Sequence, residues 1–180
     1  VVISTGAVAD LPEIAGLDVA LASGFARTID RALGEGPETL PEGPVVVWGA
    51  AEGVELALDL ARAGRSVRLL EPGAKFAPTS YIGSRTRYVM MWAGEVGLVP
   101  ETGAALSSVG DGTIIVTHAD GRIEEIACAA LVVSPGRVAY DPLSASLAGS
   151  GIQVQVVGDA RKPRSYGNSI HEAAYLARNI

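Results

Sequence analysis

The residues PVVVWGAAEG at positions 44–53 and RSVRLLE at positions 65–71 decide the fold that we expect for this chain. Val45–Trp48 is a short apolar, β-branched run of the kind found in strands buried on both faces. Gly49 opens a tight turn, and Val67–Leu70 is a second apolar run that ends at Glu71. Between the two runs, apolar residues recur at helical spacing and a glycine follows where a helix would end: Val54, Ala57, Leu58, Ala61 and Gly64. The stretch therefore predicts two parallel strands joined by a helix in a right-handed crossover.

The turn after the first strand predicts a phosphate-binding site. Backbone N–H groups at a helix N-terminus bind a pyrophosphate when small residues let it approach closely. A carboxylate about 20 residues later can accept the ribose hydroxyls of a nucleotide. The candidate residues in this chain are Gly49, Ala50, Ala51, Glu52, Gly53 and Glu71.

This turn departs at two places from the pattern Gly-x-Gly-x-x-Gly. Ala51 stands at the second glycine position and crowds a phosphate. Val54 stands at the third and should push the helix away from the strand, unless Gly53 takes over that role through a one-residue shift. Two alternatives stay open: the unit binds no nucleotide, and Glu71 is a solvated acid at a strand end.

Composition excludes several classes of function. The chain has 180 residues and a formal net charge of −6, which argues against a nucleic-acid partner. Its single cysteine, Cys128, lies in an apolar run and is expected in the core rather than at a metal site or in a disulfide. No apolar stretch approaches the length of a membrane span. The sequence begins inside an expected strand at Val1 without an initiator Met, so we expect a piece of a longer polypeptide.

Other segments extend this α/β pattern. Ser23 is expected to cap a helix with Phe25 and Ile29 on its apolar face, and residues 34–43 read as a linker. Val96–Val99 is the expected third parallel strand. Asp-Gly pairs at 111–112 and 120–121 are strong hairpin signals, so three short runs form an expected antiparallel meander: Ala104–Val109, Thr113–His118 and Arg122–Ala127.

The C-terminal part predicts a second polar site. Leu131–Ser134 reads as a buried strand that ends at Gly136, and Val154–Val157 reads as a strand that ends at Gly158 and Asp159. Asn168 or Ser169 is expected to cap the last helix. Ligands of open α/β sheets bind at the carboxyl ends of strands. The alternative is that Asp159 is a turn residue beside a solvated basic loop that contains Arg161, Lys162 and Arg164.

Together these pieces resemble the flavoproteins with two dinucleotide-binding domains, and most of all the C-terminal half of the 2,4-dienoyl-CoA reductase and trimethylamine dehydrogenase group. The segments that carry the resemblance are VISTG at 2–6, the unit at 44–71, the meander, SPG at 134–136, VVGD at 156–159 and IHEA at 170–173. The resemblance covers essentially the whole chain. It implies an α/β fold: a Rossmann-like parallel sheet with a three-stranded β-meander, plus remnants of a second dinucleotide-binding domain. It implies the end of the FAD-type domain and a connecting helix and linker in residues 1–39, an NAD(P)-binding-type domain in 40–135, and a return to the FAD-type domain in 136–180.

The same resemblance implies cofactors and partners. In that group the glycine turn and the acid matching Glu71 hold NAD(P)H. The aspartate matching Asp159 holds the ribityl chain of FAD, and the helix matching residues 169–173 points its N-terminus at the flavin; some members hold ADP instead. The FAD-side candidates are therefore Gly136, Gly158, Asp159, Ser169 and Ile170.

Further parts of such a polypeptide are expected outside this sequence. They are an N-terminal barrel with FMN and a 4Fe–4S iron–sulfur cluster, and an FAD-domain segment with its own Gly-x-Gly-x-x-Gly. We expect a cytoplasmic protein with no nucleic-acid or membrane partner, and a homo-oligomer is one option.

Two functions are therefore weighed. The first is a nucleotide-binding part of a flavin-dependent oxidoreductase that passes hydride between NAD(P)H and flavin and is inactive in isolation. The second is a non-catalytic, ADP-binding or scaffold module of a trimethylamine-dehydrogenase-like enzyme, favoured by Ala51 and Val54. No residue has the pattern of a general acid or a nucleophile, so no catalytic residue is named. Glu71 favours NADH because a carboxylate repels a 2′-phosphate, although Arg68 and Lys75 weaken that inference.

Overall fold

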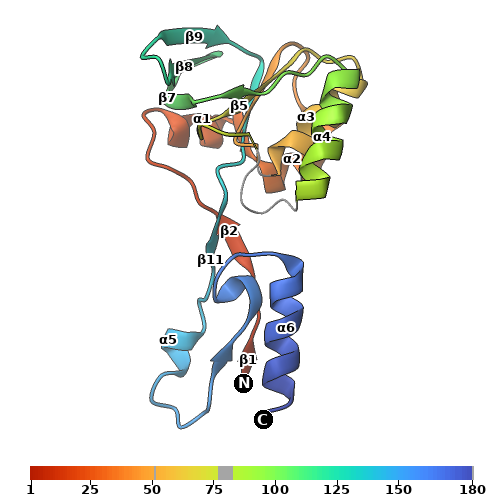
Figure 1. Cartoon of the computed structure of the whole chain (residues 1–180). Coiled ribbons are helices and arrows are strands. Elements are labelled where there is room, and N and C mark those ends of the chain that lie inside the picture. Colours follow the sequence, from red (N-terminus) through yellow and green to blue (C-terminus); the bar gives the residue numbers. More distant parts are fainter. Residues whose placement is uncertain (51, 77–82, 180) are drawn as a thin grey trace. The chain divides into compact units, whose positions relative to one another are not determined.

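A computed structural model describes residues 1–50, 52–76 and 83–179 of the chain, and Figure 1 shows its elements. The chain divides into two compact units. The larger unit is the continuous segment Leu11–Gly136, and the smaller unit combines Val1–Asp10 with Arg137–Ile180. The described part of the chain contains no helix with the length and apolar character that spanning a membrane requires.

The larger unit is built on a parallel sheet of five strands in the order β3-β10-β4-β5-β6. Strands β4 and β5 pair in parallel, as the expected strand–helix–strand unit requires. Helix α3 connects the two strands, and Gly64 follows it with a φ of 79°. The bounds are β3 Ala26–Thr28, β10 Ala130–Val133, β4 Val45–Trp48, β5 Val67–Glu71, β6 Glu101–Thr102 and α3 Gly53–Arg62. This arrangement confirms the α/β, Rossmann-like fold class.

Side chains on the two faces of this sheet enter two separate hydrophobic clusters. On one face, Val47 and Leu69 pack with buried residues of α2, α3 and α4, and Figure 1 shows these helices together. On the other face, Val46 and Leu70 pack with α1 and the meander. The indole N–H of Trp48 donates to the backbone oxygen of Ala104 at 3.0 Å and ties the sheet to the meander. The elements that cover the faces are α1 Leu17–Ser23, α2 Ile29–Glu35, η1 Pro37–Thr39, α4 Gly83–Glu95, β7 Ala104–Val109, β8 Thr113–His118 and β9 Ile123–Ala127.

Two sequence expectations within this unit are wrong. Ser23 ends α1 rather than starting a helix, because Gly24 adopts a left-handed φ of 83° and the chain then runs into β3. Thr28 is the cap of the next helix, and its hydroxyl accepts the N–H of Arg31. The strand next to β5 is β6, not residues 96–99; Leu70 and Glu71 pair with Glu101 and Thr102.

The smaller unit contains short elements and one long helix. Strand β1 pairs in parallel with β12, and β2 pairs antiparallel with β11. Helix α6 begins one residue after Ser165 and contains no buried residue. The bounds are β1 Val2–Ile3, β2 Ala7–Ala9, β11 Arg137–Ala139, α5 Ser144–Leu147, β12 Gln155–Val156, η2 Gly158–Ala160 and α6 Tyr166–Ala177.

The division into units differs from the expected boundaries at one end. The first boundary lies between Asp10 and Leu11 rather than at 39–40, because β3 pairs with β10 and α2 buries Ile29 and Ala32 in the core of the larger unit. The second boundary follows Gly136, one residue from the expected position.

Candidate functional site

The turn between β4 and α3 approaches another strand so closely that its first residue must be glycine. Gly49 has a φ of 95°, which side chains disfavour. A Cβ at this position would lie 2.0 Å from the backbone oxygen of Ser134, just after β10. The Gly49 N–H also donates to the oxygen of Leu70 at 2.8 Å. The missing side chain is therefore a condition for the turn to lie between the ends of β5 and β10.

Gly53 provides the close helix packing that the sequence pattern placed at Val54. A Cβ on Gly53 would lie 2.7 Å from Cγ1 of Val47 and 3.2 Å from Cβ of Ser134. Val54 is fully buried in the hydrophobic cluster below the helix. The expected one-residue shift is therefore what the packing requires. Ala51 lies outside the described residues, and Glu52 is the residue directly before α3.

The carboxylate of Glu71 is held by backbone N–H groups on both sides of the site. Oε2 accepts the N–H of Ala50 in the glycine turn at 3.0 Å, and Oε1 accepts the N–H of Gly73 at 2.8 Å. Glu71 is half-buried, so it is more than a solvated acid at a strand end. An ionised carboxylate has about four acceptor positions, so two remain for ligand hydroxyls. The Ala50 N–H is thus engaged by the Glu71 carboxylate.

Arg68 is engaged away from the turn. Its guanidinium pairs with Glu101 at 2.7 Å and with Glu124 of the meander at 2.8 Å. Glu124 also accepts from His118, at 2.7 Å. Hydrogen bonds from Arg68, and then from His118, lower the pKa of Glu124 to about 2, and the two carboxylates raise the pKa of Arg68. Arg68 thus links the sheet to the meander. Because its guanidinium is already paired with two carboxylates, it is not a partner for a 2′-phosphate.

The second candidate site lies in the smaller unit at the end of β12. Gly158 has a φ of 64°, and a Cβ there would lie 3.3 Å from Oγ of Ser169. Ser169 is therefore a packing residue on the fourth position of α6, and the expectation that it caps the helix is wrong because α6 starts earlier, at Tyr166. Ile170 follows it and is half-exposed. The carboxylate of Asp159 accepts the backbone N–H of Arg164 at 3.2 Å.

Glu172 is the residue of this second site that the sequence did not single out. Its Oε2 accepts the N–H of Gly158 at 2.9 Å, and its Oε1 pairs with Arg164 and, at 3.4 Å, with Arg161. The hydrogen bond from Arg164, and then that from Gly158, lower the pKa of Glu172. The sequence signals that could have found it were its place within the IHEA segment at 170–173 and its position three residues after Ser169, on the same side of a helix.

The predicted residues thus fall into two groups. The described members of the turn and Glu71 lie together in the larger unit, whereas Gly158, Asp159, Ser169 and Ile170 belong to the smaller one. Gly136 is the last residue of the larger unit, and a Cβ on it would meet nothing within 4 Å. Its φ of 119° is the feature that requires glycine there.

Neither metal nor thiol chemistry is evident in the described residues. Cys128 is buried, and burial raises the pKa of its thiol to about 11, which keeps it protonated and unreactive. No group of three or more His, Cys, Asp or Glu side chains within residues 1–50, 52–76 and 83–179 could hold a metal ion.

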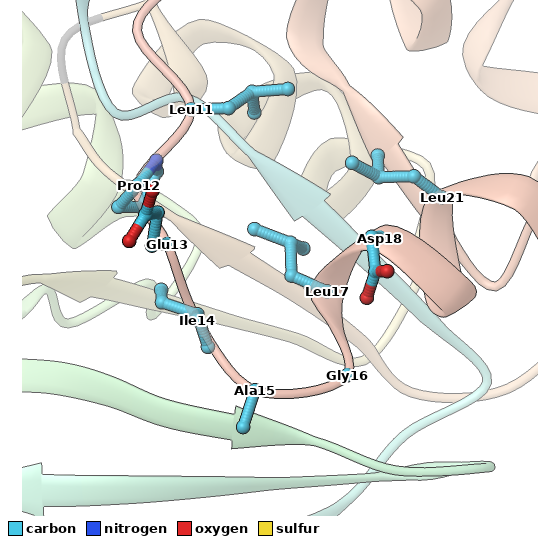
Figure 2. A pocket seen from close by; sticks show the side chains of 9 residues that line it. All are labelled: Leu11, Pro12, Glu13, Ile14, Ala15, Gly16, Leu17, Asp18 and Leu21. Carbon is cyan, nitrogen blue, oxygen red and sulfur yellow. The ribbon is translucent and has the colours of Figure 1, made fainter.

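A hollow of about 480 Å³ opens over the start of the larger unit. Figure 2 shows Leu11, Leu17 and Leu21 around it, with the carboxylates of Glu13 and Asp18 near its rim. All of its lining residues lie between positions 11 and 21, so it contains none of the predicted site residues. It is an apolar surface feature apart from the glycine turn.

Comparison with known proteins identifies relatives of both units together. A family described as pyridine nucleotide-disulphide oxidoreductase matches residues 1–162. No curated protein sequence matches. Among solved structures, 2-naphthoyl-CoA reductase in complex with 2-naphthoyl-CoA is 25% identical, with a TM-score of 0.78 over 94% of this chain and 25% of that chain.

Two further solved structures share the fold. Histamine dehydrogenase from Rhizobium sp. 4-9 is 20% identical, with a TM-score of 0.79 over 99% of this chain and 30% of that one. A HOCl-induced flavoprotein disulfide reductase from Escherichia coli is 19% identical, with a TM-score of 0.72 over 99% of this chain and 44% of that one. The present chain thus spans between a quarter and less than half of the length of these proteins.

Proposed function

The chain belongs to the pyridine nucleotide-disulphide oxidoreductase family, and from this membership we propose that it is the nucleotide-binding part of a flavin-dependent oxidoreductase that passes hydride between NAD(P)H and a flavin. The observation that carries the proposal is the glycine turn of the larger unit. Gly49 and Gly53 let the turn and the start of α3 lie closer to Ser134 and Val47 than any Cβ would permit, and the Glu71 carboxylate lies beside the turn, where it accepts the Ala50 N–H. These features fit the pyrophosphate of a dinucleotide.

The larger unit would hold NAD(P)H through residues with distinct tasks. Gly49, Ala50, Ala51, Glu52 and Gly53 would surround the pyrophosphate, and Glu71 would accept the ribose hydroxyls. NADH is the favoured form, because Glu71 repels a 2′-phosphate and Arg68 is engaged by two carboxylates. When bound, the nicotinamide supplies the hydride, and the protein binds and orients it.

The smaller unit would contribute to the flavin site. Asp159 is partly exposed and would accept hydroxyls of the ribityl chain, while Gly158 and Ser169 fix the contact between the strand end and α6. Gly136 and Ile170 are proposed to lie beside the same cofactor. ADP in place of FAD would use the same residues.

We propose that further segments of the same polypeptide complete the smaller unit. Its parallel sheet has only two strands and α6 buries no residue, whereas parallel sheets are usually covered on both faces. An FAD-domain segment is the proposed covering, and an N-terminal barrel with FMN and a 4Fe–4S cluster is the proposed further partner. A cytoplasmic location and a homo-oligomeric state also stay proposals.

The second candidate is a non-catalytic module that has lost its dinucleotide. Its sequence argument was that Ala51 and Val54 block the site. Val54 points into the core and leaves the turn free, so this residue no longer favours the second candidate. Ala51 is outside the described residues.

The test is anaerobic titration of the full-length protein with NADH and with NADPH while flavin absorbance is recorded. We expect NADH to reduce the flavin and NADPH to do so at higher concentration. If neither reduces it, hydride transfer is contradicted. Calorimetry with NADH, ADP and AMP then separates the two candidates: micromolar NADH binding supports the first, and millimolar or absent binding supports the second.

A further inference from the structure

Glu172 joins three parts of the smaller unit through one carboxylate. It lies on α6, accepts the backbone N–H of Gly158 at the strand end, and pairs with Arg164 and Arg161 of the basic loop. Its side chain is 17% exposed, whereas that of Arg161 is 65% exposed. The side chain of Arg164 is 33% exposed, so its pair with Glu172 is screened less by solvent than the pair with Arg161 and is the stronger constraint.

The basic loop folds back onto the residues that Glu172 holds. The backbone N–H groups of Arg161 and Lys162 both donate to the oxygen of Gly158, at 3.0 and 3.1 Å. The backbone N–H of Arg164 donates to Oδ1 of Asp159 at 3.2 Å. A chain of contacts therefore leads from Glu172 through Arg164 to the carboxylate of Asp159.

The packing of α6 against Gly158 places Glu172 where it can make these contacts. Ser169 touches the place where Gly158 lacks a side chain, and Glu172 follows one turn later on the same side of the helix. Arg161 and Arg164 both pair with the Glu172 carboxylate. Without Glu172, the Arg164 guanidinium would lose the anion that fixes it.

We propose that Glu172 is the positioning residue of the flavin site, and that it orients Asp159 by fixing Arg164. One oxygen of Asp159 is directed by the Arg164 N–H, and the remaining acceptor positions of this carboxylate face the ligand's hydroxyls. Glu172 itself touches no cofactor. The inference rests on the proposed function, because it assumes that the strand end binds FAD.

The test uses the full-length protein, freed of flavin and titrated with FAD while flavin fluorescence is recorded. Glu172→Gln keeps an acceptor for the Gly158 N–H but loses the charge that holds Arg164. Arg164→Met removes the other partner while its stem is retained. We expect each change to weaken FAD binding about tenfold, as loss of a charge-assisted hydrogen bond should. Lys162→Met is the matched control, since it removes an exposed cation of the same loop, and it should bind FAD like the wild type.

Two readouts separate positioning from simple destabilisation. The double variant should bind FAD no more weakly than either single variant, because both act on the same contact. The visible circular dichroism of the bound flavin should change in both single variants and stay unchanged in Lys162→Met. If Glu172→Gln fails to fold, the FAD affinity and flavin circular dichroism of Arg164→Met test the proposal.

The outcomes also separate this inference from the proposed function. Wild-type affinity in Arg164→Met, or losses that add in the double variant, would overturn the positioning role. If Asp159→Asn weakens FAD binding while Glu172→Gln does not, only the role of Glu172 is wrong. If Asp159→Asn binds FAD as tightly as the wild type, the flavin site itself is wrong.

Discussion

The two candidate sites are constructed in opposite ways. In the larger unit the glycine turn is formed by absent side chains: Gly49 and Gly53 lie against Ser134 and Val47 at distances that no Cβ permits. In the smaller unit the Gly158–Asp159 end is held by charged side chains near the surface, with Glu172 at their centre. Steric constraints are insensitive to salt and pH, whereas exposed ion pairs respond to both. The larger site should therefore fail by overpacking and the smaller one by loss of charge.

Among the variants that test this comparison, Gly49→Ala should lower the free energy of unfolding the most. The new Cβ would meet the Ser134 oxygen, and alanine disfavours the φ of 95°. Overpacking and backbone strain together should lower the free energy of unfolding by about 2–5 kcal/mol. Gly64→Ala is the matched control, because Gly64 also has a positive φ but nothing within 4 Å of its missing Cβ. Urea unfolding measures both; equal losses would show that crowding at Ser134 is unimportant.

Changes at Gly53 and Val54 test which residue packs the helix. Gly53→Val should cost about 1–3 kcal/mol through the clash with Val47 and should weaken NADH binding. Val54→Gly should cost about 2–4 kcal/mol, because it removes a fully buried side chain and places glycine in a helix. It should not tighten NADH binding. Tighter NADH binding in Val54→Gly, with Gly53→Val tolerated, would contradict the shifted register.

The larger unit also contains a contact whose stability depends on charge, at Glu124. Its folded-state pKa is lowered to about 2, so its contribution to stability is present above its ordinary pKa and is lost as the pH falls toward 2. After allowance for solvent screening, this contribution should be about 1–2 kcal/mol at pH 7. Thermal unfolding of wild type and Glu124→Gln should differ at pH 7 and converge near pH 2. Glu125→Gln, one exposed residue further along, is the control and should be as stable as the wild type at pH 7.

Arg161→Met should have the smallest effect. Its pair with Glu172 is mostly exposed, and such pairs contribute about 0–1 kcal/mol. The small difference from the wild type in thermal unfolding should vanish at about 1 M salt, where charges are screened within a few ångströms. A salt-independent loss would mean that Arg161 acts through packing, and the contrast between the two sites would be weaker than we infer.

Local signals in the sequence predicted the best-defined parts of the fold. The pattern from Val45 to Glu71 and the Asp-Gly turns of the meander each contain their own strand, turn and helix signals. The structure accordingly has β4, α3, β5, β7 and β8 within a residue or two of the expected bounds. The need for a glycine at position 53 could also be inferred, because the packing of a helix on a strand has a known geometry.

Features decided by tertiary contacts could not be predicted in this way. Strands β3 and β6 have only three and two residues, and they exist because β10 and β5 offer them a partner. The start of α6 was placed too late because several polar residues could cap it. Glu172 was overlooked because its partners, Gly158 and Arg164, approach it only after the loop folds back.

The pairing of Val2 with Gln155 has a consequence for how the chain folds during synthesis. Strand β1 leaves the ribosome before its partner β12, which follows the complete larger unit. Bringing two such distant segments together through an unfolded chain costs entropy and slows folding, whereas a larger unit that has already folded shortens the effective loop. We therefore expect the inserted unit to fold first and the smaller unit to assemble last, so that a nascent chain ending before residue 155 holds β1 without its partner.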